Sequence, residues 1–333
     1  MAHGLEISTT GETAFALRGD KPAWHKLGTN FGADEDITTA QMLELSHLNG
    51  WNVRLEELTV PEGYRTTTTS QMVVRTNPFD GGSDVLSIVG NRYKVVQNEE
   101  LFDFGDGILD GGAKWESAGS IKEGKVVFGS LVVPREFILD PQGANDKTVT
   151  YLLVHTSHDG STAVQANITP VRVVCQNTLN MALQGSKQSF KIRHTATVNG
   201  KIDEARRVLG LTFAHMDSFE TMAKQLFETA ITNKQFDDLV KSIYPAPEDG
   251  SAKVADTRWS EKNDILQHLY HNGETNANIT GTAWGALNAL TERIDYYRQG
   301  RKGNEAIVAA ASGFDPVVNA EKARVLSAVL SLV

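Results

Sequence analysis

Five basic side chains lie within one stretch of the chain that contains no acidic residue. Residues 160–202, here called the acid-free segment, contain no Asp or Glu but hold Arg172, Lys187, Lys191, Arg193 and Lys201. The segment carries +5 in a chain of formal net charge −9, so all other residues together carry −14. Because Arg and Lys offer charge and hydrogen-bond donors to phosphate oxygens, the segment predicts an anion site, to which His194 adds a further donor.

These basic residues also have explanations that need no ligand. Arg172 lies in an apolar run, where a charge requires an ion pair, an oligomer contact or an exposed groove. Lys191 and Arg193 share one face if their strand is regular, and they could equally form a solvated edge or pair with Asp203 and Glu204. Aromatic platforms for base stacking are expected at Phe190 within the segment and at Tyr93, Trp115 and Tyr151 outside it.

Metal and nucleophile chemistry have less support in the sequence. His155 and His158 stand three residues apart with Asp159 beside them, which is the arrangement closest to a metal site. Cys175 would be a nucleophile with His155 or His194 as its base, although a cysteine at such a position is more often a small core residue. The sequence contains neither a GxxxxGK(S/T) phosphate loop nor an HExxH motif, so we expect no ATP-driven chemistry and no cofactor.

The elements that would position these side chains form an antiparallel β-meander followed by a helix. Apolar patterns predict strands in KWESAGSI, KVVFGSLVV and TVTYLLVHTS, with a fourth in STAVQANITPVRVV. Cys175–Leu183 then has helical spacing, with Asn177 or Thr178 as its cap. This β-β-β-α order predicts an α+β fold in which the helix covers one face of the sheet.

The flanking regions complete the expected organisation. Residues 1–33 look irregular, and residues 1–36 are expected to form an N-terminal arm. Residues 37–202 are expected to form the α+β core, and residues 203–333 a largely helical region interrupted by the linker PAPEDGSAKVADT. Before the meander, the core is predicted to contain a helix from Thr38 or Thr39, strands in WNVRLEELTV, TTTTSQMVVRTN and DVLSIVG, a brief strand at Tyr93–Val96 and a helix from Asn98.

Composition limits the class of protein. With 40% hydrophobic and 22% charged residues over 333 positions, the chain has the make-up of a soluble globular protein. No apolar run reaches the roughly 18 residues of a membrane helix, and MAHGLEISTTGE does not resemble a signal peptide. The single cysteine excludes an internal disulfide and a multi-cysteine zinc site. We therefore expect a cytoplasmic protein without membrane association.

Four motifs, in order, give the chain a resemblance to a known family. They are PAWHKLG, VGNRYKVVQNEELF, PVRVVCQNTLNMAL with FKIRHT, and GTAWGALNALTE, and they span the chain from about Ala23 to Gln299. Together they resemble the phage- and plasmid-borne family catalogued as domain of unknown function nine-hundred-thirty-two. The resemblance implies a phage or plasmid protein in the host cytoplasm, but the family's description supplies no chemistry.

The order of strands and helix between Ala113 and Leu183 is also similar to the core of single-strand annealing recombinases. That resemblance implies a ring of identical subunits that holds single-stranded DNA by its backbone in a basic groove, without a nucleotide cofactor, in homologous recombination or replication. It also implies a phage exonuclease or a host single-strand binding protein as a partner. We therefore expect a non-enzymatic annealing protein. The alternatives are a protein-interaction module with no DNA role and a metal-dependent nuclease that uses the histidine pair.

Overall fold

The computed structural model of the chain describes most of its residues. The described ranges are 5–19, 28–58, 62–63, 69–103, 105–139, 143–172, 177–178, 189–191, 198–248, 253–297 and 316–333. For residues 172, 177–178, 189–191, 198–203, 205 and 316, only the backbone is described. The chain divides into two compact units, which are described separately below. Unit 1 comprises Met1–Pro134, Tyr151–Asn167 and Ser189–Thr212, and unit 2 comprises Arg135–Thr150, Ile168–Gln188 and Phe213–Val333.

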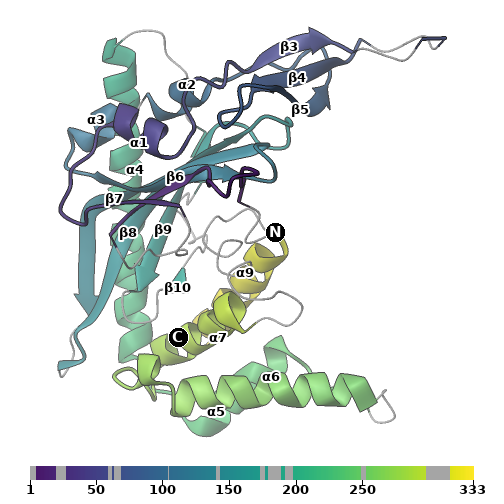
Figure 1. Cartoon of the computed structure of the whole chain (residues 1–333). Coiled ribbons are helices and arrows are strands. Elements are labelled where there is room, and N and C mark those ends of the chain that lie inside the picture. Colours follow the sequence, from purple (N-terminus) through teal and green to yellow (C-terminus); the bar gives the residue numbers. More distant parts are fainter. Residues whose placement is uncertain are drawn as a thin grey trace. The chain divides into compact units, whose positions relative to one another are not determined.

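An eight-stranded sheet contains the predicted meander (Figure 1). Its strand order is β10-β9-β8-β7-β6-β1-β2, and β11 also pairs with β9. Strands β6 and β7 pair antiparallel, with a register shift between Trp115 and Ser117. Consecutive strands from β6 to β9 are therefore neighbours, which confirms the predicted order. These strands are β6 (Lys114–Ile121), β7 (Val126–Leu139), β8 (Asp146–Ser157) and β9 (Gln165–Arg172).

Two short strands near the N-terminus extend this sheet. Strand β1 (Phe15–Arg18) pairs antiparallel with β6, and β2 (Thr29–Phe31) pairs parallel with β1. The sequence analysis predicted only irregular structure in residues 1–33, and that prediction is wrong for these two strands. Runs of four and three residues are too short to show a periodic pattern. Gly28 permits the close approach of the two segments, because a Cβ there would clash with the Phe15 carbonyl oxygen.

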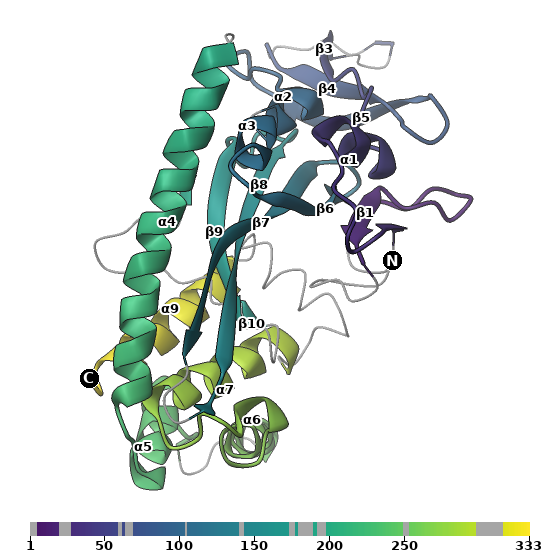
Figure 2. The ribbon, with the colours of Figure 1, turned by 90° about the vertical axis from the view of Figure 1, so that its left-hand side faces the viewer.

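Three short helices cover one face of β6 and β7 in unit 1 (Figure 1 and Figure 2). Trp115 of β6 packs against Phe102 of α2, with ring centroids 5.1 Å apart, and donates a hydrogen bond from its indole Nε1 to Thr39 of α1 over 3.2 Å. These contacts bury the indole completely. The helices are α1 (Thr39–Leu45), α2 (Asn98–Phe102) and α3 (Gly105–Leu109).

The starts of these helices test the capping predictions. Thr38 caps α1, and Gln41 completes a capping box, which confirms the predicted start. The helix predicted from Asn98 begins there, but its cap is Gln97. That helix is also divided into α2 and α3, because two glycines near residue 105 weaken a continuous helix.

A smaller antiparallel sheet, with strand order β3-β4-β5, lies in unit 1 and confirms three predicted strands. Its strands are β3 (Arg54–Glu57), β4 (Gln71–Thr76) and β5 (Ser83–Val89). The strand predicted at Tyr93–Val96 is wrong, because these residues have no ladder partner among the described strands. Tyr93 is anchored instead by a hydrogen bond from its hydroxyl to the Ser157 carbonyl oxygen over 3.3 Å.

The segment after the meander differs in part from the prediction. Asn177–Thr178, expected to cap a helix, form the short strand β10 and pair antiparallel with Arg172 and Val171 of β9. The ladder with β9 satisfies the backbone groups that a helix would otherwise use. The remainder of the predicted helix, residues 175–176 and 179–183, lies outside the described residues. Strand β11 (Ser189–Lys191) follows.

The C-terminal part of the chain is helical, as predicted. Helix α7 is buried along nearly its whole length and contacts α6 and α9 within unit 2. The predicted linker is wrong in its second half, because α6 begins at Lys253. No helix among the described residues is both long enough and apolar enough to span a membrane. The helices are α4 (Val198–Glu228), α5 (Asn233–Ile243), α6 (Lys253–His271), α7 (Ala283–Tyr296) and α9 (Pro316–Leu330), with a 3₁₀ turn η2 (Glu274–Asn276).

Candidate functional site

The predicted phosphate-binding residues fall in three settings. Lys187, Arg193 and His194 lie outside the described residues. The backbone places Lys191 in β11, opposite Gln165 of β9, in unit 1. It places Arg172 in β9, opposite Asn177 of β10, in unit 2. Lys201 lies in the first turn of α4. Their assignment as DNA-binding residues stays a prediction.

The predicted stacking residues differ in accessibility. Trp115 is completely buried, so its ring has no face open to a base in this conformation. Tyr93 is half-buried, and burial together with the Asp159 charge raises the pKa of its hydroxyl to about 12. Tyr151 of β8 is also half-buried, and burial raises the pKa of its hydroxyl as well. Phe190 lies in β11, where only the backbone is described.

The two histidines proposed as metal ligands have separate partners. His155 Nε2 lies 3.1 Å from the Asn167 side-chain amide nitrogen, and His158 Nε2 lies 3.0 Å from the Asn98 side-chain oxygen. Burial lowers the pKa of each imidazole to about 4. Asp159 instead accepts a hydrogen bond from the Ser161 backbone N–H over 2.9 Å. Within the part of the chain that the structure describes, no group of three or more His, Cys, Asp or Glu residues could hold a metal ion.

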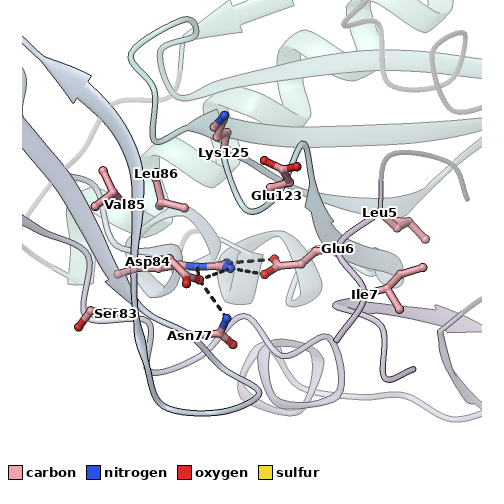
Figure 3. Close-up of a pocket in the computed structure, with 11 residues that line it drawn as sticks. Leu5, Glu6, Ile7, Asn77, Ser83, Asp84, Val85, Leu86, Glu123 and Lys125 are labelled. Atoms are coloured by element: carbon pink, nitrogen blue, oxygen red, sulfur yellow. Dashed lines mark hydrogen bonds and ion pairs between the residues drawn. The ribbon is translucent and has the colours of Figure 1, made fainter. Parts of the chain in front are cut away.

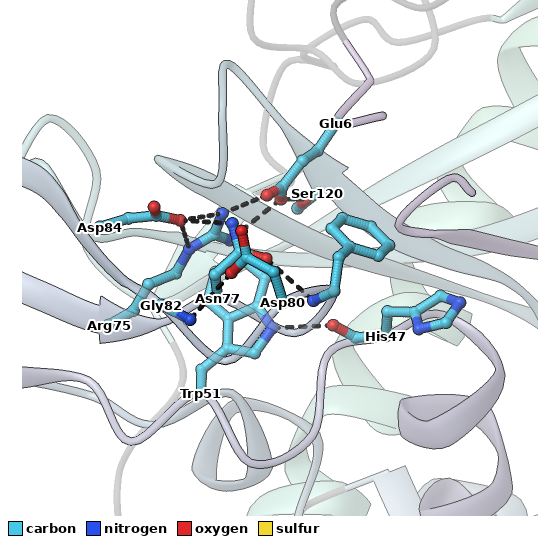
Figure 4. A network of polar contacts seen from close by, with 10 residues as sticks. Glu6, His47, Trp51, Arg75, Asn77, Asp80, Gly82, Asp84 and Ser120 are labelled. Atoms are coloured by element: carbon cyan, nitrogen blue, oxygen red, sulfur yellow. Dashed lines mark hydrogen bonds and ion pairs between the residues drawn. The ribbon is translucent and has the colours of Figure 1, made fainter. Parts of the chain in front are cut away.

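A buried arginine organises a polar network in unit 1 (Figure 4). Arg75 of β4 is 2% exposed, and its guanidinium donates to both carboxylate oxygens of Glu6, through Nη1 over 3.0 Å and through Nη2. Its Nε and Nη2 also donate to Asp84 Oδ2 over 3.1 and 2.9 Å. Ser120 donates to Glu6 over 2.5 Å, and Asn77 donates to Asp84 over 3.0 Å. The network therefore joins β4, β5, β6 and the segment around Glu6.

Apolar and backbone contacts hold this guanidinium in place. The Arg75 Cζ lies 4.1 Å from the centroid of the Trp51 ring, a favourable cation–π contact. The Trp51 indole is completely buried, and it donates a hydrogen bond to the His47 carbonyl oxygen over 2.7 Å. Gly124, with φ of +81°, leaves room for the guanidinium, because a Cβ there would clash with Arg75 Nη1. These contacts together hold the guanidinium in one position.

A pocket of about 450 Å³ opens over this network (Figure 3). Residues of β5 lie on one side of Glu6, and Leu5 and Ile7 lie on the other. The turn between β6 and β7 contributes Glu123 and Lys125. The volume is typical of small-molecule sites, about 300–1,000 Å³. The lining residues are Leu5, Glu6, Ile7, Arg75, Asn77, Ser83, Asp84, Val85, Leu86, Glu123 and Lys125.

A second feature of unit 1 is the buried carboxyl group of Glu116. It lies in β6 at the register shift opposite β7, where it has no cross-strand partner in the ladder. Burial raises the pKa of Glu116 to about 7, and the Arg18 charge offsets only part of this effect. A carboxyl group with such a pKa exchanges its proton near neutral pH, which is a property that acid–base sites use.

The pocket was not predicted from the sequence. One local signal could have indicated it: Arg75 lies inside the apolar run QMVVRTN, where a charge requires a partner. The partner, Glu6, is 69 residues away in the sequence, and no spacing rule connects the two.

Comparison with known proteins gives one match. A family model described as Domain of unknown function (DUF932) matches residues 85–313, which is more than half of the chain. No curated protein and no solved structure matches this chain significantly.

Proposed function

The chain belongs to the family described as Domain of unknown function (DUF932), and we propose that it is a single-stranded DNA-binding and annealing protein of a phage or plasmid. It acts in the host cytoplasm, in homologous recombination or replication, without ATP. The observation that carries the proposal is the acid-free segment, with five basic residues in a chain of net charge −9. The antiparallel meander that leads into this segment supports it as well.

The proposed mechanism is capture of the DNA backbone. The basic side chains of the acid-free segment neutralise phosphates and release counterions, while the bases remain free to pair with a complementary strand. Since the chain as a whole is acidic, one acid-free segment gives weak binding. A homo-oligomer gains affinity because it presents several copies of this segment along the DNA strand. A ring of subunits is the arrangement we propose, with a phage exonuclease or a host single-strand binding protein as a further partner.

The test is fluorescence anisotropy of a labelled oligonucleotide, single- and double-stranded, over a salt series. The variant Lys191→Ala/Arg193→Ala should weaken single-strand binding and reduce the slope of log K against log salt by about 1.4, or about 0.7 for each lost phosphate contact. A matched control is Arg92→Ala/Lys94→Ala, since these exposed basic residues have the same spacing but lie outside the acid-free segment. The control variant should bind as the unchanged protein does.

The outcomes separate the alternatives. Salt-sensitive single-strand binding that only the first variant weakens supports the proposal and leads to a strand-annealing assay. Absence of binding at low salt contradicts it and favours a protein-interaction module. Metal-dependent cleavage of the oligonucleotide would favour the nuclease alternative instead.

A further inference from the structure

The pocket over Arg75 has no part in DNA binding as proposed above, and its chemistry differs from that of the acid-free segment. Its charged lining contains three carboxylates and two cations, a net charge of −1, which disfavours a phosphate. Arg75 is not available to an anion, because Glu6 and Asp84 already accept four hydrogen bonds from its guanidinium. A ligand must therefore be bound by the groups that remain.

Once the Arg75–Glu6 pair is set aside, the charged groups of the lining are Asp84, Glu123 and Lys125. Asp84 accepts its three hydrogen bonds through Oδ2, and among the described residues nothing donates to Oδ1. Glu123 is exposed at the turn, and its carboxylate has no ion pair with a described residue. The two carboxylates accept hydrogen bonds and outnumber the single Lys125 ammonium, so a cationic donor is their natural complement.

The walls of the pocket are aliphatic. Leu5 and Leu86 are buried, whereas Ile7 is 41% exposed and Val85 is 57% exposed. A ligand with an aliphatic body would cover the exposed parts of Ile7 and Val85 and remove them from water. The walls and the free carboxylates together require a ligand that is cationic at one end and apolar along its length.

We propose that this pocket binds an aliphatic organic cation, an alkylammonium or alkylguanidinium group. The charged head lies near Asp84 Oδ1 and the Glu123 carboxylate, and the methylene chain lies along Ile7 and Val85. The paired Arg75–Glu6 floor fixes the position of Asp84, so the site needs no rearrangement to receive the ligand. The same chemistry is presented by a free amine and by a lysine side chain of a polypeptide, and the experiment distinguishes the two.

The experiment uses the full chain and ligand-observed NMR titrations. The probes are pentylamine for the free amine, Nα-acetyl-lysine amide for the polypeptide side chain, and pentanol and pentanoate as neutral and anionic controls. We expect pentylamine to bind and both controls to bind at least about fivefold more weakly, since the charged group supplies a charge-assisted hydrogen bond. Binding of the lysine amide as well would identify a polypeptide as a possible source, and its failure would leave the free amine as the source.

Two pairs of variants locate the binding. Glu123→Gln should weaken pentylamine binding about threefold, as expected for a partly exposed charge pair, and Glu57→Gln, at an exposed position outside the pocket, should not. Val85→Ser should weaken pentylamine binding about fivefold through the loss of apolar contact. The control for this variant is Ile88→Ser, since Ile88 is 59% exposed on the same strand but lies outside the pocket. These surface changes leave the Arg75 network intact.

The proposal is overturned if pentanol binds as tightly as pentylamine. It is also overturned if no probe binds at about 10 mM, a concentration at which a site of typical fragment affinity would be detected. A third contrary result is that the control variants weaken binding as much as the pocket variants. None of these results depends on DNA binding, so the two proposals fail separately.

Discussion

Removing the Arg75 side-chain charge tests the central interaction of unit 1. In the variant Arg75→Met, an unbranched apolar chain replaces the guanidinium beside the Trp51 ring. Glu6 keeps its hydrogen bond from Ser120 but loses both bonds from Arg75. The Glu6 side chain is only 9% exposed, so water compensates only in part for the lost partner.

The size of the effect follows from the burial of the two acidic partners. Breaking a buried ion pair by removing one member costs about 3–5 kcal/mol, because the other charge stays behind without a partner. Asp84 is 37% exposed, so its loss of Arg75 adds no more than about 1 kcal/mol. We therefore expect Arg75→Met to lower the free energy of unfolding by about 3–5 kcal/mol and Asp84→Asn by about 1 kcal/mol or less.

Urea denaturation followed by circular dichroism gives these free energies. Hydrogen–deuterium exchange of peptides from β4, β5 and residues 5–7 shows whether the loss is local to the network. The double variant Arg75→Met/Glu6→Gln removes the unpaired charge as well, and it should recover more than about 1 kcal/mol of the loss.

Two results would refute this reasoning. An equal loss from Asp84→Asn and Arg75→Met would mean that the exposed carboxylate, not Glu6, is the important partner. A double variant no more stable than Arg75→Met would mean that the cost is lost packing on Trp51 and not an uncompensated charge.

Three further predictions concern other parts of the two units. Gly124→Ala should destabilise more than Gly81→Ala by urea denaturation, because both glycines have positive φ but only Gly124 lies against Arg75. Lys322→Met should cost about 3–5 kcal/mol, since it removes the buried ammonium that lies 2.6 Å from the Asp295 carboxylate, and Lys322→Met/Asp295→Leu should recover much of that in the same assay. Burial lowers the pKa of His158 from 6.5 to about 4, so the unfolded chain binds this proton more tightly, and stability should fall as pH drops from 6.5 to about 4. His158→Phe should remove up to about 3 kcal/mol of that pH dependence in thermal melts; an unchanged slope would contradict the assignment.

Local patterns were sufficient to predict much of the fold. The meander from β6 to β9, the cap of α1 and the C-terminal helices each depend on periodicity or capping within a few residues. Strands β1 and β2 were missed, because β1 is stabilised by pairing with distant residues, such as Phe15 with Gly119, and β2 by pairing with β1. The prediction of a strand at Tyr93–Val96 was wrong for the complementary reason: the local sequence suits a strand, but no strand among the described residues pairs with it.

The two candidate sites also differ in how far the sequence alone reveals them. The acid-free segment is a property of composition, so the sequence alone reveals it. The pocket depends on Glu6, Arg75 and Ser120, which come from separate parts of the chain. Only the tertiary fold brings these residues together, and neither spacing nor charge pattern indicates it in advance.

The long separation between Glu6 and its partners also determines the order in which unit 1 can fold. Glu6 precedes Ser120 by 114 residues, and β1 can join the large sheet through β6 only after the same part of β6 has been made. At roughly 5–20 residues per second, the ribosome takes about 6–23 s to add that length, so the start of the chain is made first and docks late. Closing so long a loop also carries an entropic cost. The N-terminal segment is therefore expected to be a target for chaperones while synthesis continues, and its protection from proteases would report that unit 1 is complete.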